Sequence, residues 1–305
     1  MASGWKRTAE RVLATAGPSH LAGWATAPRT VVLAYHNIVP SGEECTGDRS
    51  LHLDQEDFAD QLDLLQGLGS VLPLSSALEP RRPGDRETRI AITFDDAYRG
   101  TMTAGVDELS KRGLPATVFV PPGLLGATGF WWDLLAAPDG ESGLSADLRA
   151  FALGTLAGRG RDIQTWATER GLTPQDLPDH ALPVEESELL DPTLADGITF
   201  GAHTWEHPNL AALAPSEAET SMLRSKEWLA STTDRYVDWI AYPYGLWSPA
   251  VAEIARRHFE GALLVDGGLA ELRGAWTSPS GAVPRVNIPR GLSPEGLRLR
   301  VTGLF

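Results

Sequence analysis

Cysteine is almost absent from this sequence. Cys45 is the single cysteine among 305 residues. One thiol excludes an intrachain disulfide, and it also excludes a zinc site built from several cysteines. This cysteine content is typical of a protein that works in a reducing compartment.

Positive charge is also scarce. The chain has 26 lysines and arginines against 40 aspartates and glutamates, which gives a formal net charge of −14. Such a surplus of negative charge disfavours nucleic acid or an anionic membrane as a partner, unless basic residues cluster locally. No such basic cluster is visible in the sequence. We therefore predict no nucleic-acid partner, and no other feature of the sequence predicts a protein partner.

Long apolar runs are missing too. No segment approaches the roughly 18 apolar residues that a membrane-spanning helix requires. Residues 1–29 also lack the unbroken apolar stretch and the small-residue cleavage site of a secretory signal. These absences predict a soluble cytoplasmic protein without a transmembrane segment. Apolar residues of this N-terminal extension recur at helical spacing and predict a short amphipathic helix: Trp5, Ala9, Val12, Leu13 and Ala16.

The chain does contain a regular alternation of short apolar runs and amphipathic segments. Hydrophobic residues make up 42% of the sequence and charged residues 22%, as in a globular protein. Strands are predicted over residues 30–36, 89–94, 116–121, 197–203, 238–243, 261–265 and 285–289. Helices are predicted over residues 53–69, 98–112, 215–230 and 248–258. This alternation predicts an α/β fold with a mainly parallel sheet that closes into a (β/α) barrel.

One long segment interrupts the alternation. Residues from about 123 to 196 contain no convincing strand and are rich in glycine, proline and aspartate. A segment of this length is too long for a simple connection between two elements of a compact domain. We therefore predict a helical insertion at about 123–196 within a barrel domain that covers residues 30–305.

Polar residues follow several of the predicted strands. Asp95 and Asp96 come after "AITF", His203 and His207 stand in "HTWEHP", and His36 follows "VVLAY". Carboxylates and imidazoles at one edge of a barrel suit a divalent metal, and two histidines with one aspartate leave positions open for water and substrate. Such a site is catalytic rather than structural, because bound metal lowers the pKa of water while the other aspartate can take the proton.

Each of these motifs also has an ordinary structural explanation. Paired aspartates after a strand often cap a helix, and two histidines four positions apart are common by chance. "YPYG" at 242–245 alone would be a turn, and His36 alone would be a hydrogen-bonded histidine at the edge of the core. None of these explanations accounts for the placement of all four motifs at the ends of strands.

The same motifs carry a resemblance to a known family. "TFDD" at 93–96, "HTWEHP" at 203–208 and "YPYG" at 242–245, in this order, resemble the NodB-homology polysaccharide deacetylases of carbohydrate esterase family four. The resemblance covers roughly residues 30 to 290. It implies a distorted (β/α) barrel and the metal-dependent removal of an acetyl group from a sugar. "YHNI" at 35–38 is similar to the first strand of deacetylases that act on exopolysaccharide N-acetylglucosamine.

The resemblance also implies residue roles. Asp95 is then the general base, and the backbone N–H of Tyr244 helps to bind the oxyanion. The implied metal is a divalent ion, for which we expect zinc, with cobalt or nickel as alternatives. The implied metal ligands are Asp96, His203 and His207.

The sequence departs from the family pattern in three places. Ala241 stands where the family usually has an arginine that orients the base, which makes Arg285 in "VPRVNIP" the candidate for that role. The usual late Leu-x-His has no counterpart after Trp276, which leaves His36 as the candidate acid. Ala97 follows the aspartate pair where glycine is usual.

The predicted substrate contacts lie in or next to these motifs, at Tyr98, Trp205 and Pro243, and near the start of the insertion, at Trp131 and Trp132. The two adjacent tryptophans either stack on sugar rings as part of a lid or pack as core of the insertion. The predicted substrate is an acetylated sugar or glycan. The alternatives are an O-acetyl esterase or deacylase of a small metabolite, and a carbohydrate-binding protein without activity, against which the intact set of two aspartates and two histidines argues.

Overall fold

The computed structural model describes residues 29–137, 143–269 and 278–303. Its strands are β1 (Thr30–Tyr35), β2 (Asn37–Val39), β3 (His52–Asp54), β4 (Ser70–Val71), β5 (Arg89–Phe94), β6 (Ala116–Val120), β7 (Ile198–Ala202), β8 (Tyr236–Ala241), β9 (Gly261–Gly267) and β10 (Val283–Asn287). Its α-helices are α3 (Gln55–Leu68), α4 (Leu74–Leu78), α5 (Val106–Arg112), α6 (Trp131–Leu134), α7 (Ala146–Gly154), α8 (Gly160–Glu169), α9 (Glu186–Leu189), α10 (Pro215–Thr232), α11 (Pro249–His258) and α12 (Pro294–Val301).

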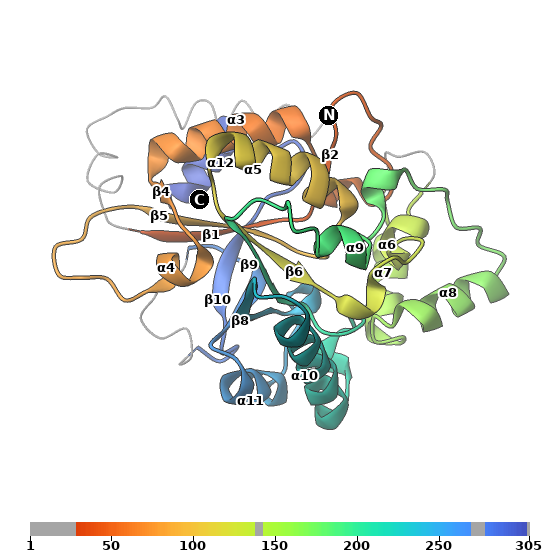
Figure 1. Ribbon diagram of the computed structural model, residues 1–305. Helices are drawn as coiled ribbons and strands as arrows, with labels where there is room; N and C mark the ends of the chain where they lie inside the picture. The colour runs from red at the N-terminus through yellow and green to blue at the C-terminus, as the bar shows by residue number, and fades with distance from the viewer. Residues whose placement is uncertain (1–28, 138–142, 270–277, 304–305) are drawn as a thin grey trace.

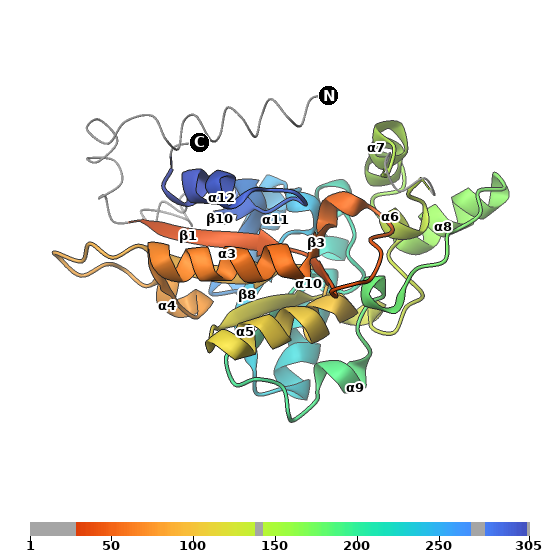
Figure 2. The ribbon, with the colours of Figure 1, turned by 90° about the horizontal axis from the view of Figure 1, so that it is seen from above.

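The central sheet closes on itself. Its strand order is β1-β10-β9-β8-β7-β6-β5-β4, and β1 also pairs with β5, so that β1 and β5–β10 form a closed ring of parallel strands. Helices surround this ring, with α3, α5 and α12 on one side and α10 and α11 on the opposite side (Figures 1 and 2). The predicted fold class, a distorted (β/α) barrel, is confirmed.

The barrel is distorted beside β5. The whole of β1 pairs with β5, from Thr30 opposite Arg89 to Tyr35 opposite Phe94. The other edge of β5 is shared, because β4 pairs with its first half and β6 pairs only with its end at Thr93 and Phe94. Since β1 and β5 end in register, the next residues of the chain, His36 and Asp95, emerge at the same edge of the barrel.

A small apolar cluster fills the interior of the barrel. Successive side chains of a strand alternate between the two faces of a sheet, so that the interior receives every second residue. Leu74 and Ala77 of α4 also join this cluster and pack against it from the start of the strands. Thr93 and Arg285 lie two residues beyond interior residues and therefore point inward as well. The strand residues of the cluster are Val32, Ala91, Phe119, Ala241, Leu263 and Val283.

The segment between β6 and β7 lies to one side of the barrel and contains α6, α7, α8 and α9 (Figure 1). No named strand occurs in the part of this segment that the structure describes. The segment has its own apolar cluster, to which Tyr98 of the barrel also belongs. The cluster consists of Tyr98, Phe130, Trp131, Trp132, Leu144, Ala152 and Ile163.

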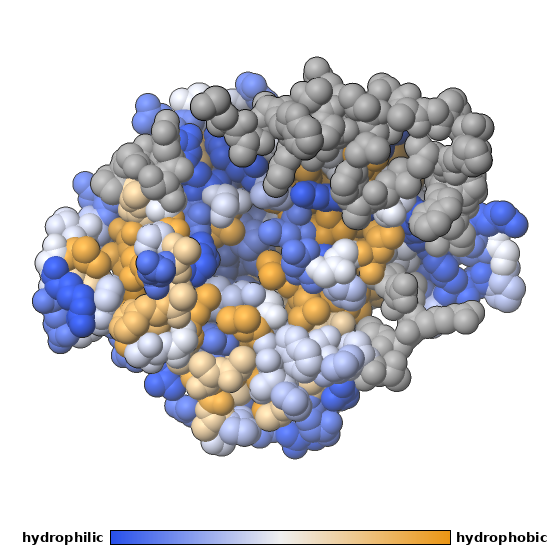
Figure 3. Space-filling view, turned by 180° about the vertical axis from the view of Figure 1, so that it is seen from behind, coloured by the Kyte–Doolittle hydropathy of each residue, from blue (hydrophilic) through white to orange (hydrophobic). Residues whose placement is uncertain are grey.

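The predicted N-terminal helix lies outside the described residues. Within the described ranges, no helix is both long enough and apolar enough to cross a membrane. On the face turned away from the viewer in Figure 1, hydrophobic residues are interspersed across the middle and hydrophilic residues gather toward the sides (Figure 3).

Candidate active site

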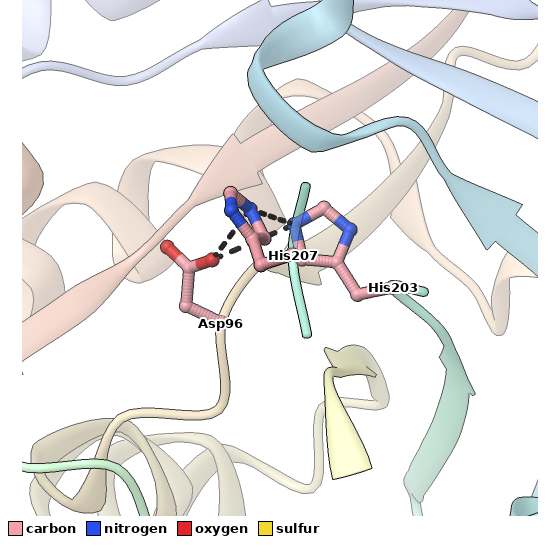
Figure 4. A group of neighbouring side chains, drawn as sticks. All are labelled: Asp96, His203 and His207. Carbon is pink, nitrogen blue, oxygen red and sulfur yellow. Dashed lines mark hydrogen bonds and ion pairs between the residues drawn. The ribbon is translucent and has the colours of Figure 1, made fainter. Parts of the chain in front are cut away.

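Three predicted metal ligands converge at the end of the barrel strands. Asp96 follows β5, and His203 and His207 lie in the loop after β7. The Oδ1 atom of Asp96 is 3.1 Å from Nε2 of His207 and 3.5 Å from Nε2 of His203, and the two Nε2 atoms are 2.9 Å apart (Figure 4). All three side chains are buried. Asp96 and the two histidines, which are 107 and 111 positions away in the sequence, therefore present three ligand atoms to one point.

The arrangement fits a divalent metal. A tetrahedral ion with bonds of about 2.0–2.1 Å holds its ligand atoms roughly 3.3 Å apart, close to the distances between these three atoms. Nδ1 of His203 donates to the backbone oxygen of Ala241 over 2.8 Å, which leaves the lone pair of Nε2 free to face the cluster. Nitrogen and carboxylate ligands of this kind suit zinc, cobalt or nickel.

The charges around these ligands favour an ionised carboxylate. Burial alone would raise the pKa of Asp96, but the adjacent His207 and His203 outweigh it and hold this pKa well below its usual range. Burial lowers the pKa of His207 despite the carboxylate beside it. A negative oxygen on Asp96 and a neutral imidazole on His207 are the protonation states in which these two side chains bind a metal. Burial would lower the pKa of His203, but the nearby Asp95 and Asp96 outweigh it and raise this pKa, so metal would have to displace a proton there.

Asp95 lies beside the metal ligands and forms an ion pair with Arg285. The guanidinium of Arg285 is fully buried and donates to both carboxylate oxygens, to Oδ1 over 2.8 Å and to Oδ2 over 2.6 Å. It also donates to Oγ1 of Thr93 over 3.0 Å. Burial would raise the pKa of Asp95, but the charge of Arg285 outweighs it and lowers this pKa. A two-point pair of this kind fixes the plane of the carboxylate.

A cavity of about 250 Å³ lies at this end of the barrel. Asp95, the three metal ligands and His36 all line it, so the structure brings the predicted acid to the predicted base. Burial lowers the pKa of His36 although Asp96 and Asp95 act to raise it. The insertion contributes to the same cavity through Trp132, Arg149 and Leu153.

The sequence of the barrel matches a known family. A family model described as polysaccharide deacetylase matches residues 82–259, which is more than half of the chain. The chain belongs to the polysaccharide deacetylase family. The resemblance to NodB-homology deacetylases is therefore confirmed. His36 and Arg285 lie outside the matched residues.

Solved structures of deacetylases share the fold of this chain. The Streptococcus pyogenes deacetylase PplD, in complex with acetate, is 20% identical with a TM-score of 0.58, and the match covers 90% of this chain and 99% of PplD. IcaB from Ammonifex degensii is 17% identical with a TM-score of 0.60, over 91% and 97% of the two chains. A de-N-acetylase from Aggregatibacter actinomycetemcomitans is 14% identical with a TM-score of 0.52, over 77% and 87%. No curated protein sequence matches significantly.

Several residues of the deacetylase site have a backbone conformation that side chains rarely adopt. Positive φ angles are uncommon outside glycine and cluster at functional sites, where the surrounding structure holds them. Ala97, at the position where glycine is usual in the family, has a φ of 57°. The turn after the aspartate pair therefore requires the conformation that glycine adopts most easily. The other positive-φ residues at the site are Asp96, Thr204, His207 and Tyr244.

The predicted aromatic contacts with substrate lie mostly in the interior of the protein. Tyr98 is fully buried, and its hydroxyl is used within the protein, so it does not face the cavity. Trp131 and Trp132 are only 3% exposed, which favours core packing over a lid. Trp132 nevertheless lines the 250 Å³ cavity. Direct substrate contact is therefore retained as a proposal for Trp132 but not for Tyr98.

The other two predicted contacts lie apart from the small cavity. Trp205 lines a neighbouring cavity of about 740 Å³, where the guanidinium of Arg224 lies 3.7 Å from the centre of one of its rings. Pro243 is buried in the turn Pro243–Gly245 and is not among the residues that line either cavity. Its position shapes the turn that carries Tyr244.

Sequence reasoning missed two charged residues of the insertion. Arg149 of α7 lines the cavity and pairs with Asp48. Asp133 of α6 is fully buried and accepts hydrogen bonds from Tyr98 and His52. A signal was present for Asp133, because it is a lone carboxylate directly after the tryptophan pair in the apolar stretch "GFWWDLL". No comparable signal marked Arg149.

Proposed function

We propose that this deacetylase removes the N-acetyl group from an N-acetylated sugar or glycan in a metal-dependent hydrolysis that releases acetate. The observation that carries the proposal is the meeting of Asp96, His203 and His207 at metal-ligand distances beside the ion-paired Asp95. The family match and the fold shared with deacetylases support the same chemistry. One of the solved structures is named as a de-N-acetylase, which supports the N-acetyl substrate.

Each residue of the cavity has a separate part in the proposed reaction. Bound metal would polarise the acetyl carbonyl and lower the pKa of an attacking water. Asp95 takes the proton of that water, and Arg285 keeps the carboxylate ionised and correctly oriented for this transfer. The backbone N–H of Tyr244 donates to the oxyanion that forms on the acetyl oxygen.

His36 is the proposed acid. The nitrogen that leaves an amide needs a proton, because an unprotonated amine leaves poorly. Burial lowers the pKa of His36, so this imidazole is mainly neutral at pH 7 before the reaction starts. His36 must therefore receive, within the cycle, the proton that it passes to the amine.

The lowered pKa of His36 favours a second candidate function, the hydrolysis of an O-acetyl ester. The leaving group of an ester depends less on a proton donor than the leaving group of an amide. A neutral His36 would limit amide hydrolysis more than ester hydrolysis. A small acylated metabolite remains an alternative substrate of the same kind. The cytoplasmic location and the choice of zinc also stay predictions.

Acetate release from matched substrates tests the function. The experiment compares N-acetylglucosamine oligomers with O-acetylated oligosaccharides at equal acetyl concentration. We expect acetate from the N-acetylated oligomers at a higher kcat/KM. A higher kcat/KM on the O-acetylated series would show that the protein acts as an O-acetyl esterase instead. No acetate from either series, with each of the three metals supplied, would contradict both.

Removal of the metal is expected to abolish this activity. A chelator should reduce acetate release to background, because the water then loses its activation and the oxyanion loses charge stabilisation. Zinc, cobalt or nickel should restore the activity at one equivalent per chain. Elemental analysis of the purified protein measures the occupancy. Full activity in protein shown to be free of metal would contradict the proposal.

Substitution of His36 is expected to separate amide from ester substrates. His36→Ala should lower kcat by about 10²- to 10⁴-fold on N-acetylated oligomers, the usual contribution of a positioned proton donor. Activated acetyl esters should lose far less, because their leaving groups need no proton. Rates of the wild type and the variant on both substrates measure the difference. An equal loss on both would mean that His36 does not act as the acid.

A further inference from the structure

The two histidine ligands of the metal cluster are held in different ways. Nδ1 of His203 donates to a backbone oxygen. Nδ1 of His207 is buried and has no hydrogen-bond partner among the described residues. Metal-binding histidines usually have the second ring nitrogen fixed by a hydrogen bond, which sets the plane of the ring. The ring of His207 must therefore be oriented mainly by packing.

Besides the ring of His203, which lies 4.5 Å from that of His207 between centroids, two aromatic rings supply this packing. The ring of Tyr244 lies 4.5 Å from that of His207 between centroids, at 79°, and the ring of Trp132 lies 5.0 Å away, at 53°. Trp132 and Tyr244 also contact each other edge to face at 5.9 Å. The contact of Tyr244 with His207 is edge to face, an arrangement that aromatic rings favour at such distances, and the contact of Trp132 with His207 is tilted. The position of His207 thus depends on where Trp132 and Tyr244 are held.

Hydrogen bonds from the insertion hold both of these rings. Nε1 of Trp131 donates to the hydroxyl of Tyr244 over 3.0 Å. Nε1 of Trp132 donates to the hydroxyl of Tyr98 over 2.8 Å, and that hydroxyl donates to Oδ2 of Asp133 over 2.7 Å. A hydrogen bond therefore fixes the polar tip of each ring; Trp132 is buried and Tyr244 is half-buried.

Asp133 is the end of the hydrogen-bond series that starts at Trp132 and passes through Tyr98, and it is itself held by further hydrogen bonds. Its Oδ1 atom accepts from Nε2 of His52 over 2.9 Å and from the backbone N–H of Asp48 over 2.8 Å. Nδ1 of His52 in turn accepts from Nδ2 of Asn37 over 2.9 Å. The carboxylate is 0% exposed, and a buried charge is costly unless hydrogen bonds compensate for it. Asp133 thereby links the insertion to the small sheet of β2 and β3, where Asn37 and His52 lie.

We propose that Asp133 is a positioning residue for the metal ligand His207, and that it acts through Tyr98 and Trp132. This inference rests on the metal-dependent function proposed above. It gives the insertion a role in holding the metal, because the carboxylate and Trp132 both belong to α6. The chain of contacts runs from Asp133 through the Tyr98 hydroxyl and the Trp132 indole to the His207 ring.

The test removes the link in the middle. Tyr98→Phe deletes one hydroxyl and leaves the ring that packs in the cluster. We expect the dissociation constant of zinc to rise by about 10- to 100-fold, as is usual when the partner that orients a metal ligand is lost. Competition with a chromogenic chelator measures this constant without any turnover.

Tyr35→Phe is the matched control. Tyr35 is also buried, and its hydroxyl donates over 3.0 Å to Oε1 of Gln61 in α3, on the outer face of β1. The same hydroxyl deletion there should lower the melting temperature of the metal-free protein by a similar amount and leave the zinc constant unchanged. An equal rise of the zinc constant in both variants would mean that general loosening is responsible, and would overturn the proposal.

Further variants keep the result decisive if Tyr98→Phe does not fold. Trp132→Phe keeps an aromatic ring but loses the donor to Tyr98, and Asp133→Asn weakens the acceptor; each should raise the zinc constant. Substitutions within one series of hydrogen bonds should also be non-additive. The double variant Asp133→Asn with Tyr98→Phe should therefore raise the zinc dissociation constant little more than either substitution alone. Unchanged zinc constants in Trp132→Phe and Asp133→Asn, with a wild type that binds zinc, would overturn only this inference. A wild type that binds no metal would overturn the proposed function with it.

Discussion

Asp95→Asn is expected to abolish acetate release while the protein still binds its metal. The amide cannot accept the proton of the attacking water, and loss of a general base costs about 10²- to 10⁴-fold in rate. Asp96→Asn should instead weaken metal binding, because Asp96 contributes the carboxylate of the metal cluster. Rates and bound metal, measured on the same preparations, distinguish the two substitutions.

The ion pair between Asp95 and Arg285 affects the comparison of the two variants, because only Asp95→Asn breaks it. Asp95→Asn leaves the buried guanidinium of Arg285 without its carboxylate, and an unpaired buried charge costs about 3–5 kcal/mol. The free energy of unfolding must therefore be measured for both variants, and the assays must run well below the melting temperature. Equal loss of metal in both variants would refute the proposed division of roles between the two aspartates.

Arg285→Gln is expected to have the second large effect. It removes the charge that pairs with Asp95 and leaves that carboxylate buried, which should destabilise the protein by about 3–5 kcal/mol. It should also lower kcat, because the base loses the partner that fixes its orientation and keeps it ionised. Denaturant unfolding and steady-state rates measure the two consequences.

Arg285→Lys separates charge from orientation. A lysine retains the positive charge but cannot make the parallel two-point contact with a carboxylate. If the orientation of Asp95 matters, Arg285→Lys should recover most of the free energy of unfolding that Arg285→Gln loses, but only part of the lost kcat. Wild-type kcat in a folded Arg285→Gln protein would show that Asp95 needs no partner from β10.

The barrel strands and the convergence of the candidate metal ligands could be predicted because their signals are local. A parallel strand buried on both faces is an almost continuous apolar run, and polar side chains that follow such runs meet at one edge. The aspartate pair after β5 and the two histidines after β7 are of this kind. Their convergence follows from the closure of the sheet.

The rest of the site depends on contacts that the sequence does not display. Arg285 could be named as a candidate only because Ala241 left a role open, and its contact with Asp95 spans 190 positions. Arg149 and Asp133 belong to short helices whose packing is set by tertiary contacts. The strands β2 and β3 have three residues each, too few for a recognisable pattern.

The pairing of β1 with β10 has a consequence for how the enzyme forms during folding. His36 follows the first strand of the ring and Arg285 belongs to its last strand, so the site is complete only when the two ends of the barrel meet. Contacts between distant parts of a chain form slowly, because they require the closure of long loops. The metal ligands all come from the middle of the chain, between β5 and β8, and could assemble earlier. A nascent chain could therefore complete this ligand cluster before Arg285 orients the proposed base, and the full arrangement of the site would be one of the last features to form.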